Sequence, residues 1–198
     1  MKLSVQGLNS FYGPAHILFD VALEVGNGEV VALLGCNGAG KSTTFRSIVG
    51  LVEQREGRIV FEGRDVSAEP THAIVRSGLG YVPEERRIFT DLTVEENLEV
   101  GRQPPRPNAP QWTRDKLFEL FPNLGEMRNR PGGRMSGGEQ QMLTIARTLM
   151  GNPSLVLLDE PSEGLSPKIV EQMVEAIMTM KQEGVSIVVS EQNLHFAN

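Results

Sequence analysis

The sequence is poor in the features that mark secreted and membrane-spanning proteins. A single cysteine, Cys36, excludes an internal disulfide and fits a reducing cytoplasm. The first residues contain no long apolar segment of the signal-peptide kind, and runs such as Val30–Leu34 and Leu155–Leu158 are far too short to cross a bilayer. The net charge of −6 provides no basic surface for nucleic acid. At 198 residues the chain is long enough for one substantial core with an inserted subdomain.

The stretch that organises the chain is a glycine-rich turn between an apolar segment and a helix start. Val30–Leu34 predicts a buried strand, the chain turns at Gly35, and Lys41 opens the helix. The spacing Gly35-x4-Gly40-Lys41-Ser42 is the P-loop pattern. Glycines allow a backbone to curl closely round phosphates, and a helix N-terminus attracts anions. The lysine adds a charge toward the β- and γ-phosphates, and the serine hydroxyl suits Mg²⁺.

We therefore expect this loop to bind a nucleoside triphosphate rather than to be a plain glycine turn. The residues expected to contact the nucleotide are Gly35, Asn37, Gly38, Ala39, Gly40, Lys41, Ser42 and Thr43. Cys36 lies inside the loop and has two interpretations. It is either a small residue at a tolerant position or a thiol whose oxidation blocks phosphate entry.

A second motif follows the apolar segment Leu155–Leu158, which predicts a buried strand that ends in two carboxylates, Asp159 and Glu160. The carboxyl ends of parallel strands face the ligand crevice. At that edge Asp159 can hold Mg²⁺, and Glu160 can orient or deprotonate a water molecule. Without the P-loop the same pair would be interpreted as a solvated strand end.

Short strands are predicted on both sides of the P-loop. Residues 3–8 and 17–25 alternate like strands about a break at Tyr12, and segments 58–61 and 79–82 follow. An antiparallel N-terminal sheet beside the P-loop core is therefore expected. Tyr12 is either packed in the core or turn, or it is an aromatic ring that stacks on adenine.

Helical signals dominate the middle of the chain. Thr93 and Glu96 form a capping-box pattern, and the proline-rich stretch Gln103–Gln111 must be a loop. Residues 113–121 predict a short amphipathic helix that Pro122 stops. This insert is either simple surface packing or a surface on which a partner docks.

A second cradle-like sequence precedes a later helix. Met135–Gln141 places Ser136 and two glycines at a helix N-terminus, an arrangement that receives anions like the P-loop but lacks its lysine. The alternative is an ordinary helix N-cap that contains glycine. Farther along, the Ser-Pro pair at 166–167 starts a long helix that ends at Gly184, and a last buried strand, Val185–Ser190, follows.

Together these motifs resemble the nucleotide-binding subunit of ABC transporters over nearly the whole chain. Met135–Gln141 looks like the family's signature (usually LSGGQ), and its place just ahead of Asp159-Glu160 makes the likeness specific. The stretches GLGYVPEERRIFTDLTVEENL and DEPSEGLSP look most like the ATPases of branched-chain amino acid importers. The resemblance implies an α/β fold, with a P-loop NTPase (RecA-like) core, an N-terminal antiparallel β subdomain and an inserted α-helical subdomain. It implies a single domain, with residues 1–84 and 151–198 in the core and 85–150 in the helical subdomain.

The resemblance also implies roles for individual residues. Glu160 would be the catalytic carboxylate, together with Glu84 and Gln192, and Tyr12 would stack on adenine. The metal ligands would be Ser42, Glu84 and Asp159. The residues that would contact ATP bound to a partner subunit are Ser136, Gly137, Gly138 and Glu139. Residues 163–166 would cross to that partner, so that two chains pair head to tail around two nucleotides.

The chain departs from the family pattern at three places. Glu84 stands where glutamine is usual, and it adds negative charge beside the phosphates. Gln192 replaces the switch histidine; it can donate a hydrogen bond but cannot take up a proton, so Glu160 is expected to act as base alone. The chain also stops soon after its last predicted strand, where relatives continue, so we expect a truncated chain or a natural fragment. Three histidines are expected to be surface or structural residues rather than ligands: His16, His72 and His195.

The sequence therefore predicts an ATP- and Mg²⁺-dependent hydrolase that powers import of branched-chain or similar small amino acids. The resemblance implies a second ATPase subunit, identical or different, transmembrane permease subunits and, indirectly, a periplasmic solute-binding protein, but no nucleic acid. It places the chain peripherally at the cytoplasmic face of the inner membrane. Two alternatives remain: a soluble ABC ATPase of repair or translation, and a chain that binds nucleotide without turnover.

Overall fold

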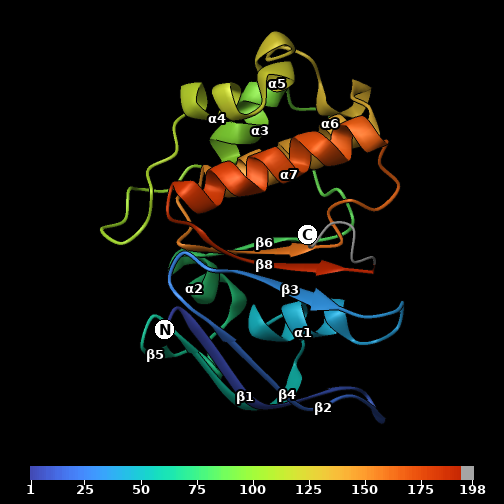
Figure 1. The fold of residues 1–198 in the computed structure, drawn as a ribbon, viewed down its shortest axis with the longest axis vertical. Helices are drawn as coiled ribbons and strands as arrows, with labels where there is room; N and C mark the ends of the chain where they lie inside the picture. Colours follow the sequence, from blue (N-terminus) through green and yellow to red (C-terminus); the bar gives the residue numbers. More distant parts are fainter. Residues whose placement is uncertain (193–198) are drawn as a thin grey trace.

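The structure, a computed structural model that describes residues 1–192, contains two separate sheets with a helix between them (Figure 1). The N-terminal sheet is antiparallel and has the strand order β2-β1-β4-β5. Its strands are β1 (Leu3–Tyr12), β2 (Ala15–Val25), β4 (Gln54–Phe61) and β5 (Arg64–Asp65). A tight turn at Gly13, whose φ is 55°, joins the first two strands.

The second sheet is wholly parallel and has the order β3-β8-β7-β6. Its strands are β3 (Val30–Leu34), β6 (Leu79–Val82), β7 (Leu155–Asp159) and β8 (Ser186–Glu191). The two central strands, β7 and β8, are buried along their whole length, which explains why their sequences are almost continuously apolar. Because the strands are parallel, their carboxyl ends meet at one edge, and the candidate site lies there.

Helices fill the space between the sheets and cover the far face of the parallel sheet. The helices are α1 (Lys41–Ile48), α2 (Thr71–Arg76), α3 (Val94–Gly101), α4 (Arg114–Leu120), α5 (Pro122–Glu126), α6 (Gly137–Leu149) and α7 (Pro167–Gln182), with a 3₁₀ turn at Gly132–Arg134. Helix α1 packs between the two sheets, while α7 and the group α3–α6 lie on the other side of the parallel sheet (Figure 1). One apolar core lies between the sheets, around Phe45 and Phe61, and the other lies beneath α6 and α7, around Leu143 and Met173.

The architecture confirms the expected fold class, a P-loop core with an antiparallel N-terminal sheet and an insert of helices between β6 and β7. Some boundaries differ from the prediction. Strand β1 runs on to Tyr12, β4 begins at Gln54, and neither β5 nor α2 was predicted. The proline-rich segment is a loop, as expected.

The prediction for Pro122 was only half right. Helix α4 ends at Leu120, before the proline, but Pro122 then begins another short helix, α5. Proline is favoured at a first helical position because its missing N–H would have no partner there and its fixed φ suits the helix. Within residues 1–192, none of the helices combines the length and the apolar character that crossing a membrane requires.

The histidines of the described part of the chain make structural contacts or lie on the surface. His16 Nε2 lies 3.0 Å from Asn9 Oδ1, and its ring stacks on Phe11 with a centroid separation of 4.3 Å. His72 is exposed at the start of α2. The prediction for His195 falls outside the described residues.

Candidate functional site

The loop between β3 and α1 has the backbone that its glycines permit. Gly38 and Gly40 have φ values of 82° and 88°, in the left-handed region that residues with a side chain rarely adopt. A Cβ on Gly40 would lie only 2.7 Å from Leu18 Cδ2. Within residues 1–192, the N–H groups of these two glycines have no hydrogen-bond acceptor. The loop can therefore offer them to an anion at the N-terminus of α1.

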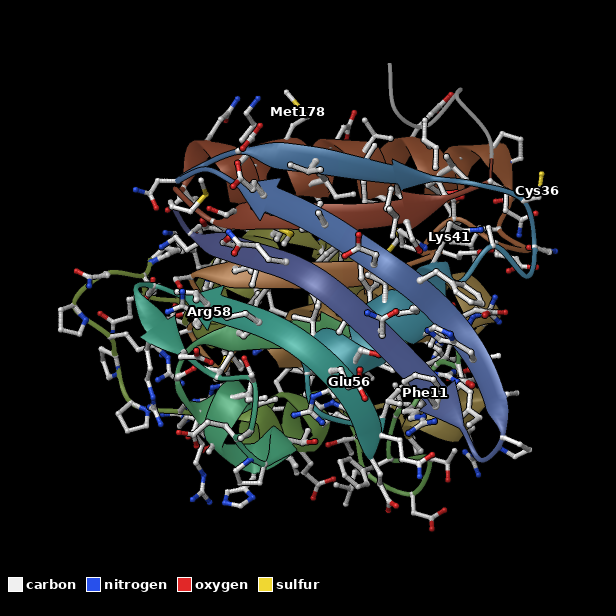
Figure 2. All side chains as sticks on the ribbon, turned by 90° about the horizontal axis from the view of Figure 1, so that it is seen from below. Phe11, Cys36, Lys41, Glu56, Arg58 and Met178 are labelled. Carbon is white, nitrogen blue, oxygen red and sulfur yellow. The ribbon has the colours of Figure 1, made fainter. Side chains whose placement is uncertain are left out.

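Lys41 is folded back beneath the loop rather than extended into solvent. Its side chain is 5% exposed, and Nζ donates to the carbonyl oxygens of Gly35 at 2.7 Å and Cys36 at 3.1 Å. The same Nζ lies 3.1 Å from Glu160 Oε1. Figure 2 shows Lys41 on the inner side of the loop and Cys36 at its outer edge, where the thiol is exposed. The fold thus fixes the positive charge of the lysine within the loop.

Asp159, at the carboxyl end of β7, is fully buried and accepts three hydroxyl groups. Ser42 Oγ donates to Oδ1 at 3.0 Å, Ser190 Oγ donates to Oδ1 at 2.8 Å, and the Tyr81 hydroxyl donates to Oδ2 at 3.2 Å. Burial and the charge of Asp159 raise the pKa of the Tyr81 phenol, so that it stays a donor. The carboxylate is therefore held in one orientation beside the start of α1.

The oxygen atoms of Ser42 and Asp159 form a donor set that fits Mg²⁺, a hard cation that prefers oxygen ligands. In the part of the chain that the structure describes, no group of three or more His, Cys, Asp or Glu side chains could hold a metal. A site of this kind suits an ion that takes few protein ligands and completes its shell with phosphate and water. Glu84, predicted as a further ligand, lies at the same edge of the sheet, but it is exposed and makes no hydrogen bond to Ser42 or Asp159.

Glu160 directly follows β7 and is buried beside Lys41 and Ser190. Its backbone has a φ of 45°, and its N–H donates to Ser190 Oγ at 3.0 Å. Burial would raise the pKa of the carboxyl, but hydrogen bonds from Gln192 and Lys41 outweigh it and leave the pKa below its ordinary value. Gln192 Nε2 lies 2.5 Å from Glu160 Oε2. Gln192 therefore holds the carboxylate from one side while Lys41 holds it from the other.

The carboxylates of Glu160 and Glu84 both lie near that of Glu163. The hydrogen bond between Glu163 and Glu160, together with burial and the charge of Glu84, raises the pKa of the Glu163 carboxyl. A cluster of like charges is costly without a cation or a hydrogen-bond donor among them.

Glu191, the last residue of β8, is a buried carboxylate that the sequence motifs did not single out. Its side chain is 5% exposed; Oε2 accepts Ser162 Oγ at 3.0 Å, and Oε1 has no hydrogen-bond partner within residues 1–192. Burial raises the pKa of this carboxyl. Tyr81 and Ser190 were also missed. Their signal was available, since polar residues at the carboxyl ends of predicted parallel strands belong to the ligand edge.

Tyr12 is the last residue of β1 and is 46% exposed, which excludes the interpretation as a core residue. Its hydroxyl and that of Tyr81 contribute to raising the pKa of the Arg46 guanidinium on α1, with Tyr81 the larger influence. The ring therefore lies near the first helix after the loop. Its stacking on adenine stays a prediction.

The signature segment begins α6 with a capping box. The Ser136 N–H donates to Glu139 Oε2 at 2.7 Å, and the Glu139 N–H donates to Ser136 Oγ at 3.4 Å. In residues 1–192, no hydrogen bond or ion pair joins this segment to Lys41, Ser42 or the loop before them.

Comparison with known proteins gives a consistent result. The sequence model described as "ABC transporter" matches residues 18–163. The chain is 45% identical to the high-affinity branched-chain amino acid transport ATP-binding protein BraG of Pseudomonas aeruginosa, over 98% of this chain and 84% of BraG. It is 39% identical to the lipopolysaccharide export system ATP-binding protein LptB of Haemophilus influenzae, over 97% of this chain and 80% of LptB. The structure also resembles the solved ADP conformation of MJ1267, an ATP-binding cassette of an ABC transporter. The match covers 99% of this chain and 83% of the MJ1267 chain, with a TM-score of 0.81 and 26% identity.

Proposed function

The chain is an ATPase subunit of the ABC transporter family, and we propose that it hydrolyses ATP to drive uptake of branched-chain or similar small amino acids. The observation that carries the hydrolytic part is the meeting of Lys41, Ser42, Asp159 and Glu160 at one edge of the parallel sheet. The likeness to BraG supports the class of solute. The ATPase itself need not contact the solute, so its specificity would lie in other subunits.

In this proposal the loop N–H groups and Lys41 bind the phosphates of ATP, and Ser42 and Asp159 hold Mg²⁺. The metal would neutralise charge on the phosphate oxygens. A γ-phosphate at the loop competes with Glu160 for Lys41. Glu160, ionised at neutral pH, then orients and deprotonates the attacking water, and Gln192 keeps its second oxygen in place. The charge of Glu84 helps to raise the pKa of the Glu163 carboxyl, but Glu84 makes no hydrogen bond to Ser42 or Asp159.

We further propose that two ATPase subunits, identical or different, pair head to tail. Ser136, Gly137, Gly138 and Glu139 of one subunit would then face the triphosphate on the loop of the other, and residues 163–166 would lie along the interface. This arrangement would account for the presence of two anion-receptive helix N-termini, before α1 and before α6, in one chain. The solved structure of MJ1267, which matches this chain with a TM-score of 0.81, has the fold on which the pairing would be built.

The surface for a permease is proposed to be an apolar groove between α2, α3 and β6. It has a volume of about 480 Å³, and its rim exposes apolar side chains: Leu51, Val75, Phe89 and Val100. Arg147 lies 5.1 Å from the Phe89 ring and adds a cation–π contact at the edge. Exposed apolar side chains gathered in one groove are typical of partner sites. An ATPase that binds the permease through this groove would act at the cytoplasmic face of the membrane. A periplasmic solute-binding protein would be its indirect partner.

The central test is ATP hydrolysis by the full chain with Mg²⁺, compared with uptake of radiolabelled leucine in cells that carry or lack the gene. Uptake should be lost without the chain and restored by it. For the permease surface, Phe89→Ser should abolish both uptake and co-purification of the permease. Met178→Ser is the matched control, because Met178 is as exposed (47% against 48% for Phe89) but lies on α7, outside the groove. Equal loss in both variants would contradict the proposed surface.

A second function has its own support. The 39% identity to LptB favours an ATPase of a lipopolysaccharide exporter over most of the same residues. The two proposals differ in their partner proteins and in the phenotype of a deletion. Loss of leucine uptake with a normal envelope supports the importer, whereas an envelope defect with normal uptake supports the exporter.

A further inference from the structure

Arg86 lies in the segment between β6 and α3, two residues after Glu84, and it is half-buried. Its guanidinium Nη2 donates to the carbonyl oxygen of Glu163 at 3.4 Å. A Cβ on Gly164 would lie 3.8 Å from the same nitrogen. Within the described residues the guanidinium forms no ion pair with any carboxylate. It is therefore placed by backbone and glycine contacts rather than by a charged partner.

The guanidinium also lies against Gly137, the first glycine of the signature segment. A Cβ on Gly137 would lie 2.9 Å from Arg86 Cζ, closer than real Cβ atoms approach other atoms. The planar guanidinium thus occupies the space that any side chain on Gly137 would need. Arginine suits this position because its flat, rigid group can lie on a backbone surface while it donates to a carbonyl, which an ammonium group does less well.

We propose that Arg86 is a positioning residue that locks together the segment after Glu84, the signature at Gly137 and the loop at Glu163. This inference rests on the proposed function, in which the last two segments face the nucleotide of the partner subunit. Arg86 contacts both and comes from a third segment, so it fixes the relative position of the groups that this chain presents across the interface. Among the residues that the structure describes, no hydrogen bond or ion pair joins Arg86 to the P-loop, which in this proposal binds the chain's own nucleotide.

Two consequences separate this role from simple structural support. Loss of Arg86 should weaken pairing of the subunits but leave binding of ATP to the chain's own loop unchanged. In addition, Gly137→Ala should act by displacing Arg86. Once Arg86 is removed, the added methyl group should therefore have little further effect, and the two substitutions should not be additive.

The experiment measures ATP- and Mg²⁺-dependent dimerisation of the full chain by sedimentation velocity, in a Glu160→Gln background that blocks turnover. Arg86→Ala and Gly137→Ala should each weaken pairing about tenfold, and the double variant should be no weaker than either one. Arg86→Lys, which keeps the charge but not the planar group, should pair as weakly as Arg86→Ala. Binding of a fluorescent ATP analogue to the unpaired chain, measured at a concentration where the parent is still monomeric, should change less than about twofold in all of them.

Arg87→Ala is the matched control, because Arg87 is the next residue and its side chain is 66% exposed, 3.6 Å from Glu85. It should pair like the parent. If the parent itself stays monomeric with ATP, the head-to-tail arrangement fails, and the inference fails with it. If the parent pairs and Arg86→Ala pairs equally well, only the inference is overturned. Additive losses in the double variant, or weaker binding of the ATP analogue, would overturn it too.

Discussion

Lys41 and Glu160 form a buried ion pair, with Nζ 3.1 Å from Oε1, although one begins α1 and the other follows β7. The pair joins the glycine-rich loop to the residue proposed as the general base. Together with the larger effect of the Gln192 hydrogen bond, it leaves the pKa of Glu160 below its ordinary value although burial opposes this. A triphosphate on the loop must compete for the lysine, so substrate binding and release of the base are linked through one side chain.

Glu160→Gln should lower ATP turnover by about a hundredfold to ten-thousandfold, the usual contribution of a general base. Binding of ATP should be preserved, because the amide no longer competes as a charge for Lys41, and a nucleotide-bound dimer should accumulate. Phosphate release, titration with a fluorescent ATP analogue and sedimentation velocity measure the three effects. Glu175→Gln, on the exposed face of α7, is the control and should behave like the parent. Turnover of Glu160→Gln near that of the parent would rule out the assignment of the base.

Glu191→Gln should stabilise the chain at neutral pH. Burial, and to a lesser degree the charge of Glu160, raise the pKa of the Glu191 carboxyl above its ordinary value of 4.5. The folded chain therefore holds this proton more tightly than the unfolded chain, and stability is lost as the pH rises above 4.5. The amide cannot ionise, and its oxygen can still accept the Ser162 hydroxyl.

The melting temperature of Glu191→Gln should exceed that of the parent at pH 8, and the difference should shrink toward pH 4.5. In a chain of this size each kcal/mol recovered corresponds to about 2–4 °C. Glu183→Gln is a suitable control, because this carboxylate at the end of α7 is exposed and paired with Lys116. A melting difference that is the same at both pH values would show that Glu191 does not titrate in this range.

The parts of the site that the sequence predicts are those whose chemistry is local. The P-loop is a continuous run of residues, and glycine spacing, lysine and helix start all lie within it, so Gly40 and Lys41 could be identified without a structure. The cap at Ser136 is equally local, because its partner Glu139 is three residues away. The fold class followed from the same motifs through the family resemblance.

The parts that could not be predicted depend on contacts between distant segments. Nothing in the sequence near Arg86 indicates that its guanidinium lies on Gly137, since that contact is set by the packing of α6 against the segment after β6. The orientation of Gln192 toward Glu160 is set by the pairing of β7 with β8. The start of α5 at Pro122 was missed for another reason: proline stops one helix and starts another with the same fixed φ.

Gly40→Ala should lower the free energy of unfolding more than Gly38→Ala does. Both glycines have a left-handed backbone, so each substitution should cost about 1 kcal/mol in strain. Only at Gly40 would the new methyl group also meet a neighbour, Leu18 Cδ2 at 2.7 Å, whereas a Cβ on Gly38 has open space around it. Overpacking of this kind costs about 1–3 kcal/mol. Chemical denaturation should show the difference, and equal unfolding free energies would contradict the packing of Leu18 against the loop.

Alkylation of Cys36 should inhibit nucleotide binding. The thiol is exposed at the outer edge of the loop, while the carbonyl oxygen of the same residue accepts Lys41 Nζ at 3.1 Å. A bulky group on this side chain is therefore expected to disturb the backbone that holds the lysine and to obstruct the approach of phosphate. Because the chain has one cysteine, N-ethylmaleimide modifies a single site, which mass spectrometry can verify.

After full modification, affinity for a fluorescent ATP analogue should fall by about tenfold or more, since a lost hydrogen bond to a charged group costs about 1.5–3 kcal/mol. ATP and Mg²⁺ added beforehand should slow the modification. Cys36→Ser should bind nucleotide normally and should not respond to the reagent, which separates the effect of bulk from that of losing the thiol. Unchanged ATPase activity in the fully alkylated chain would show instead that Cys36 is only a small residue at a tolerant position, and that the outer edge of the loop plays no part in phosphate entry.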